Sequence, residues 1–381
     1  MAEYKMVRLG DYITEYSVKN KSNEDIPVYS VTNTQGFCTE YFSKDVSSKD
    51  KSNYKIVPRG CFAYNPSRIN VGSVDWQRYE DRVIVSPLYN VFKVSPELEN
   101  QYLYYFLKSD IGHTLITSKA EGSVRDNLKI TMLAEFSIPL PPLETQKLIV
   151  AQLDKCTALI AKHKQMLEKY DTLIKSRFIE MFGDNPIENG KWKVEKLGNL
   201  GLCKNGMNFS YEDNGFEINC LGVGDFKDNA VISNCEKLPV ISLNEKPSEE
   251  YLLKDNDIVF VRSNGNKELV GRSVLVHPRV LTTFSGFCIR FRLSTDSINH
   301  LFLLQFLKMP NTRKNMAGRG ANIQNLNQQI LSNLDIPVPQ IELQNDFASF
   351  VQQIDKSKFA VQKSLEKAET LYKSLMQEYF N

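Results

Sequence analysis

The sequence predicts an α+β protein built as a pseudo-twofold internal repeat. Two strand-rich α/β domains are expected, joined by two long helices that pair as an antiparallel coiled coil. Three observations predict this fold. One phrase occurs twice, an apolar stripe with helical spacing follows each copy, and a region of short predicted strands precedes each copy.

The repeat has a long period. Ile138-Pro139-Leu140-Pro141 returns as Ile336-Pro337-Val338-Pro339, and Glu144 and Gln146 return as Glu342 and Gln344. A period of about 200 residues is too long for a solenoid unit. It indicates a duplicated module of one domain and one helix, hence two similar binding events. The predicted segments are a first domain over 1–141, a first helix over 142–184, a second domain over 185–338 and a second helix over 339–381.

The two helices are predicted from heptad spacing. Apolar residues alternate at steps of four and three from Ile149 to Ile174, and again from Phe347 to Tyr379, where only Lys358 interrupts them. This spacing is typical of a coiled-coil seam. Because a domain separates the seams, they can bury each other in antiparallel order; the alternative is that each helix packs on its own domain. The residues predicted to pair are Ile149, Leu153, Ile160, Leu167, Ile174, Val351, Ile354, Leu365 and Leu375.

Each domain is predicted to contain short strands followed by an aromatic-rich helix. Runs of β-branched and aromatic residues bounded by turn formers predict these strands. The two domains resemble each other less than the two helices do, which indicates one scaffold with two different targets. The expected strands are 28–31, 56–64, 83–85 and 89–94 in the first domain and 257–261, 273–276 and 287–293 in the second; the helices are 101–108 and 300–308.

Polar loops after two of these strands are candidate DNA contacts. Arginine can form paired hydrogen bonds with guanine, and asparagine with adenine. The loops at 65–72 and 262–272 have this composition, as do a second pair at 122–127 and 320–325. The alternatives are that asparagine and glycine shape turns, or that asparagine caps a helix. The candidate DNA-binding residues are Asn65, Ser67, Arg68, Asn70, Arg125, Asn127, Arg262, Ser263, Asn264, Asn266, Lys267, Arg272, Arg313, Lys314, Arg319, Asn322 and Gln324.

Composition excludes several classes of protein. We find no catalytic constellation, and the seven scattered cysteines and four histidines show no metal-ligand spacing. No long apolar run and no secretory leader are present, so we expect a cytoplasmic protein without a membrane span. The net charge of +2 is weak for a nucleic-acid-binding protein. If the protein binds DNA, either local basic loops or a partner must therefore supply many of the phosphate contacts.

The segment Ile138-Pro139-Leu140-Pro141-Pro142-Leu143-Glu144-Thr145-Gln146, with Asp335-Ile336-Pro337-Val338-Pro339, resembles the helix-entry phrases of type I restriction-modification specificity subunits. The resemblance covers the whole chain, although the second copy departs at Gln340-Ile341. It implies a non-enzymatic subunit with two target-recognition domains, each reading half of a split site in double-stranded DNA.

The resemblance also implies partners. Two methyltransferase subunits would dock on the helices and carry the cofactor S-adenosylmethionine, and restriction motor-nuclease subunits would join them. The helices would fix the unread gap. Their outward cations, Lys155, Lys162, Lys169 and Arg177, are candidate docking residues or simply solvated charge. The alternatives are a non-DNA interaction scaffold, or a methyltransferase or nuclease with built-in recognition.

Overall fold

The computed structural model describes residues 4–39, 50–120, 127–210, 212–226, 230–317 and 325–380. The chain forms two compact units. Unit 1 comprises Met1–Gln165 and Gln362–Asn381, and unit 2 comprises Met166–Val361. Each unit thus combines one globular region with one part of each long helix. Unit 1 is therefore made of two stretches of the chain, whereas unit 2 is one continuous stretch.

Unit 1 is built around an antiparallel sheet with the strand order β2-β9-β6-β7. The predicted strand over 56–64 is divided into β5 and β6, because Gly60 between them has φ of 85° and its N–H donates to the carbonyl of Gln77. The strands are β1 (Met6–Arg8), β2 (Ile13–Glu15), β3 (Ser30–Thr32), β4 (Gly36–Cys38), β5 (Lys55–Pro58), β6 (Phe62–Tyr64), β7 (Val74–Trp76), β8 (Arg82–Val85), β9 (Asn90–Val94) and β10 (Ser137–Pro139).

Helices cover the sheet of unit 1 and complete its core. Tyr102 and Phe106 are buried against the sheet, and Phe380 near the end of the chain packs on both, with ring centroids 5.2 and 5.9 Å away. Ile149 and Leu153 join the same core. Both long helices therefore supply core residues to unit 1. The shorter helices are α1 (Asn100–Lys108), α2 (Asp110–Ala120) and α3 (Ile130–Leu133), with a 3-10 turn η2 at Ile69–Val71.

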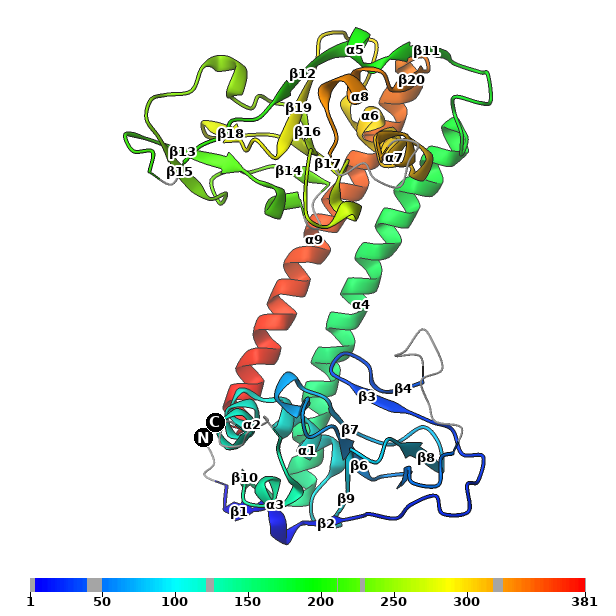
Figure 1. The fold of residues 1–381 in the computed structure, drawn as a ribbon, viewed down its shortest axis with the longest axis vertical. Helices are drawn as coiled ribbons and strands as arrows, with labels where there is room; N and C mark the ends of the chain where they lie inside the picture. The colour runs from blue at the N-terminus through cyan, green and yellow to red at the C-terminus, as the bar shows by residue number, and fades with distance from the viewer. Residues whose placement is uncertain are drawn as a thin grey trace. The chain divides into compact units, whose positions relative to one another are not determined.

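Unit 2 repeats this plan with additions. Its main sheet has the order β12-β19-β16-β17-β14, which matches β2-β9-β6-β7 with one strand added, and a second sheet has the order β15-β13-β18 (Figure 1). The strands are β11 (Lys193–Lys196), β12 (Gly201–Asn205), β13 (Phe216–Leu221), β14 (Val231–Ile232), β15 (Val240–Leu243), β16 (Asp257–Val261), β17 (Ser273–Val276), β18 (Thr282–Phe284), β19 (Cys288–Leu293) and β20 (Asp335–Val338).

An aromatic cluster forms the centre of unit 2. The ring of Phe302 lies 4.7 Å from Phe182 and 5.5 Å from Phe178, and Phe178 lies 5.4 Å from Phe347. Stacked and edge-on aromatic pairs of this kind add to the free energy gained by burial. The shorter helices of unit 2 are α5 (Leu197–Leu200), α6 (His300–Leu307), α7 (Pro310–Ala317) and α8 (Gln328–Ser332), with a 3-10 turn η5 at Lys267–Leu269.

The long helices α4 (Leu143–Phe182) and α9 (Ile341–Phe380) pack against each other within each unit. In unit 1 the Tyr379 hydroxyl near the end of α9 bonds Gln152 near the start of α4, and Lys164 lies 3.2 Å from Glu369. In unit 2 Phe178 near the end of α4 meets Phe347 near the start of α9. The helices therefore run antiparallel, and the predicted fold is confirmed.

Lys358 interrupts the apolar seam in the sequence but is accommodated in unit 2. Its Nζ donates to Asp171 Oδ1 of α4 at 2.6 Å. Toward the helix ends the seam enters the domain cores, since Ile149 and Leu153 belong to one core and Ile174 and Val351 to the other. Helix pairing and packing on the domains thus occur together. In the described part of the chain, no helix combines the length and apolarity needed to cross a bilayer.

Candidate nucleic-acid interface

Two loops that the sequence marks as DNA-facing meet in unit 1. The loop after β6 approaches the segment before α3: the Ser67 hydroxyl donates to Asn127 Oδ1 at 2.7 Å, and Leu128 N donates to the Pro66 carbonyl at 3.2 Å. The Tyr64 hydroxyl, at the end of β6, donates to the Leu128 carbonyl at 3.0 Å. The structure therefore joins two loops that lie about 60 residues apart in sequence.

The corresponding loops meet in the same way in unit 2. Leu326 N donates to the Arg262 carbonyl at 2.8 Å, and Ser263 forms an isolated antiparallel bridge with Asn325. Arg262 follows directly on β16, as Asn65 follows on β6. In each domain, the loop after the central strand therefore meets the last residue of the second candidate loop, which is Asn127 in unit 1 and Asn325 in unit 2.

Three of the asparagines shape the backbone of these loops. Asn65 Oδ1 accepts from Ser67 N at 3.1 Å, Asn264 Oδ1 accepts from Asn266 N at 2.8 Å, and Asn266 Oδ1 accepts from Glu268 N at 3.0 Å. These are Asx turns, so the alternative interpretation as turn formers holds for the side-chain oxygens. The Nδ2 donors of the same side chains make no hydrogen bond to any residue that the structure describes, and they remain available to a ligand.

The loop after β6 is hydrogen-bonded by a lysine that was not among the candidates predicted from the sequence. Lys108, the last residue of α1, donates to the carbonyl of Gly72, whose φ of 91° ends the 3-10 turn η2. Burial lowers the pKa of Lys108. His113 Nε2 lies 2.9 Å from the Asn70 carbonyl of the same loop. The sequence does mark this lysine, because the tripeptide Phe106-Leu107-Lys108 recurs as Phe306-Leu307-Lys308 in the second half of the chain.

Lys308 takes a related place in unit 2. It lines a pocket of about 490 Å³ together with Gly271, Arg272 and Arg313 of the candidate surface and Asp355 of α9. Burial, together with the neighbouring Lys358, lowers the pKa of Lys308 to about 8. Lys308 thus shares a pocket with Arg272 and Arg313 of the candidate surface.

The basic residues of unit 2 separate into two groups. The Arg262 guanidinium donates to the Gly286 carbonyl at 3.3 Å, and Arg313 Nη2 donates to the Glu268 carbonyl at 2.6 Å. Both arginines therefore form one group, which hydrogen-bonds the loop backbone. The side chain of Asn266 on the same loop is exposed. Lys314, next in sequence to Arg313, lines a different pocket.

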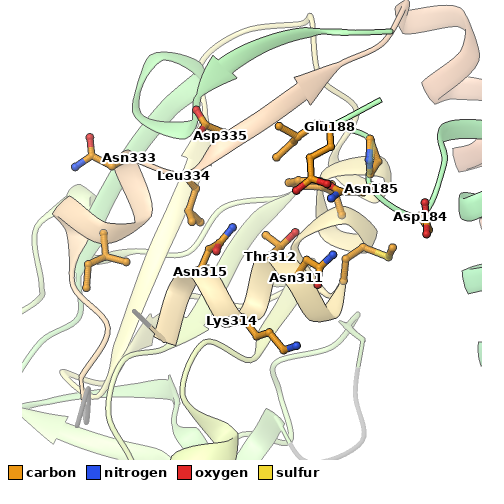
Figure 2. Close-up of a pocket in the computed structure, with 15 residues that line it drawn as sticks. Asp184, Asn185, Glu188, Asn311, Thr312, Lys314, Asn315, Asn333, Leu334 and Asp335 are labelled. Atoms are coloured by element: carbon orange, nitrogen blue, oxygen red, sulfur yellow. The ribbon is translucent and has the colours of Figure 1, made fainter. Parts of the chain in front are cut away.

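That second pocket has a volume of about 760 Å³ and lies between α7, the segment after α4 and the segment before β20. Figure 2 shows Asn311, Thr312 and Asn315 of α7 on the side of the pocket across from Glu188. The lining combines polar and charged residues with apolar ones, among them Ile187, Phe306 and Leu334. Among the described residues, no group of three histidine, cysteine, aspartate or glutamate side chains could hold a metal ion.

Several predicted contacts fall outside the described residues. These are Arg125, Arg319, Asn322 and Gln324, and the side chain of Lys267. They stay predictions. Of the remaining candidates, Arg68 and Ser67 are exposed, and Asn70 and Arg272 are half-buried.

Comparison with known proteins gives the family. The model of the type I restriction modification DNA specificity domain matches residues 1–169 and 189–369. The chain is 25% identical to the StySPI type I restriction enzyme specificity subunit of Salmonella potsdam, over 98% of this chain and 84% of that protein. It is 23% identical to the MjaVIII type I restriction enzyme specificity subunit of Methanocaldococcus jannaschii, over 98% and 91%.

Solved structures share the fold. A chain from a study of complex assembly and conformational transition of the type I R-M system matches with a TM-score of 0.58 at 17% identity, covering 100% of this chain and 98% of that one. The type I restriction-modification S subunit from M. genitalium matches with a TM-score of 0.58 at 14% identity, covering 99% and 96%. The chain therefore belongs to the family of type I restriction modification DNA specificity domains, and it carries two copies of that domain.

Proposed function

We propose that this chain is the non-catalytic DNA-recognition subunit of a type I restriction-modification complex, in which each globular domain reads one half of a split DNA site. The observation that carries the proposal is a contact between polar loop residues that recurs in both domains, Ser67 with Asn127 and Ser263 with Asn325. The loops share a backbone frame and differ in side chains, as two readers of different sequences require. Arginine and asparagine suit direct readout of base edges.

The long helices supply the spacing and the docking surface in this proposal. Outward-facing residues recur in the two copies: Glu168, Lys169, Thr172, Leu173, Lys175 and Ser176 correspond to Glu366, Lys367, Thr370, Leu371, Lys373 and Ser374, and all are exposed. The residue between them differs, being the buried Ile174 in one copy and the half-buried Tyr372 in the other. Exposed positions usually vary more freely than buried ones, so identity on the outside supports two copies of one partner.

That partner is the methyltransferase subunit, which would carry S-adenosylmethionine; restriction subunits would then join the complex. The low net charge of +2 supports separate roles for the subunits: the partners provide phosphate contacts, and this chain contacts the bases. The affinity of the isolated chain for DNA would then fall only weakly with salt.

The experiment that tests the proposal is a base-resolution adenine methylome of cells with and without this gene. Loss of one split motif, two short blocks around a fixed unread gap, is the expected result. The same motif should be methylated by the purified complex of this chain with its methyltransferase subunit. A purified complex that assembles but prefers no DNA sequence would favour an interaction scaffold, and methylation or cleavage by the chain alone would favour an enzyme.

A further inference from the structure

A large apolar side chain stands exposed in the turn before β19 of unit 2 and in the turn before β9 of unit 1. Phe287, in the turn between β18 and β19, is 62% exposed, and Leu88, in the turn between β8 and β9, is 75% exposed. Single exposed apolar residues are common on protein surfaces and need no explanation by themselves. Their position in the fold, however, is shared.

The turn of Phe287 precedes β19, which pairs with β16, and the turn of Leu88 precedes β9, which pairs with β6. Strands β16 and β6 each lead into a candidate loop. Cys288 of β19 pairs with Val261, the last residue of β16, and Asn90 of β9 pairs with Tyr64, the last residue of β6. The candidate loops begin at the next residue, Arg262 or Asn65. Phe287 directly precedes Cys288 and so lies next to the polar surface that begins at Arg262. Leu88 lies in the corresponding turn of unit 1, two residues before Asn90 rather than one.

The turn that carries Phe287 is fixed to that surface. Arg262 N donates to the Phe287 carbonyl at 2.8 Å, and the Arg262 guanidinium donates to the Gly286 carbonyl at 3.3 Å. Phe287 N donates to Ser285 Oγ at 3.1 Å, and Gly286 N donates to the Met207 carbonyl. A side chain at Gly286 would collide with Asn208. Phe287 is thus held out from a firmly bonded turn that is hydrogen-bonded both to Met207 and to Arg262, the first residue of the candidate loop.

We propose that Phe287 contacts the base pairs of the half-site that the second domain reads. This inference rests on the proposed function. A hydrocarbon side chain has no hydrogen bond to offer a phosphate, but it can contact a thymine methyl group or wedge against a base step. The hydrogen bond from Arg262 N to the backbone carbonyl of Phe287 places this residue with the polar readers rather than with the helix surfaces that would meet a protein partner.

The test uses the complex with the methyltransferase subunit and the variants F287A and L202A. Leu202 is the matched control, because it is 70% exposed on the edge strand β12 of the same unit. Binding to cognate and to unrelated DNA is measured by fluorescence anisotropy over a range of salt concentrations. Loss of one base contact by an aromatic ring predicts about a tenfold weaker affinity of F287A for cognate DNA. The affinity for unrelated DNA and the slope of affinity against salt should stay as in the wild type.

Two outcomes would overturn the inference. F287A could bind cognate DNA as L202A and the wild type do, or it could fail to assemble with the methyltransferase subunit, which would make Phe287 part of a protein interface. Substitutions in the DNA sharpen the test, since F287A should lose discrimination in one half-site only. Failure of the proposed function has a different signature: the wild-type complex itself would bind cognate and unrelated DNA equally.

Discussion

Gln146 and Gln344 make the same three hydrogen bonds in the two halves of the chain. Gln146 Oε1 accepts from Glu99 N at 2.8 Å, and its Nε2 donates to the carbonyls of Glu97 and Pro141 at 2.9 Å. Gln344 Oε1 accepts from Asn299 N at 2.8 Å, and its Nε2 donates to the carbonyls of Ser297 and Pro339. Both side chains are fully buried. Each ties the start of a long helix to the start of a domain helix.

Replacing Gln344 with leucine should destabilise unit 2 strongly. The change leaves the backbone groups of Asn299, Ser297 and Pro339 without their partner, and an unsatisfied buried polar group costs about 1–3 kcal/mol. We expect the free energy of unfolding in urea to fall by about 3 kcal/mol. Q353L is the control, because Gln353 is exposed on the same helix. Equal stability of the two variants would contradict the role of the buried amide.

Replacing Lys308 with methionine should change how stability depends on pH. Burial lowers the pKa of Lys308 from 10.5 to about 8. Between these values the unfolded chain binds a proton that the folded protein does not, so the free energy of unfolding of the wild type rises with pH in this window. K308M lacks this rise. We expect K308M to gain stability over the wild type below pH 8 and to lose that advantage toward pH 10.5. A difference that is constant with pH in denaturant titrations would count against a buried cation.

Arg313 and Lys314 are neighbours with different expected roles. Arg313 Nη2 bonds the carbonyl of Glu268 at 2.6 Å and so braces the loop, whereas Lys314 lines the pocket of Figure 2. R313A should therefore weaken discrimination in one half-site, by about tenfold if one base contact is lost. K314A should keep the preference between sequences. Competition binding of single-base variants of the cognate site measures both. Equal loss of discrimination in the two variants would show that the bond from Arg313 to the loop backbone is not what maintains discrimination between sequences.

Shortening both long helices tests the spacing role. Deleting residues 156–162 and 357–363 removes one heptad from each helix and keeps the apolar seam in register. Seven residues correspond to about 10 Å of helix, or about three base-pair steps of DNA. The unread gap in the methylated motif should shorten while both half-sites stay the same. Altered half-sites with the original gap would disprove the ruler.

The fold was accessible from the sequence because its main signals are periodic. The heptad pattern predicted α4 and α9, and the repeated phrase showed that the chain carries two related modules. Positive φ at Gly60, which divides one predicted strand into two, left a weaker signal, since glycine occurs both in strands and in turns. Lys358 looked like a defect in the seam, because its partner Asp171 lies 187 residues away in the sequence.

The candidate site was accessible only in part. The loop positions followed from composition, but the meeting of Ser67 with Asn127 depends on tertiary contacts that no local pattern encodes. The repeat of Phe106-Leu107-Lys108 marked Lys108, but its support of the loop was missed because a lysine at a helix end is ordinarily solvated. Phe287 was assigned to the start of a strand, and only its exposure in the fold separates it from core phenylalanines.

The composition of unit 1 has a consequence for synthesis of the protein. Unit 2 is continuous, from Met166 to Val361, whereas unit 1 needs the residues from Gln362 onward, including Met376 and Phe380 of its core. On the ribosome, the second domain therefore has its whole complement of residues before the first one does. The domain that is translated first is the last to be completed, and its apolar core must wait for the final turns of α9.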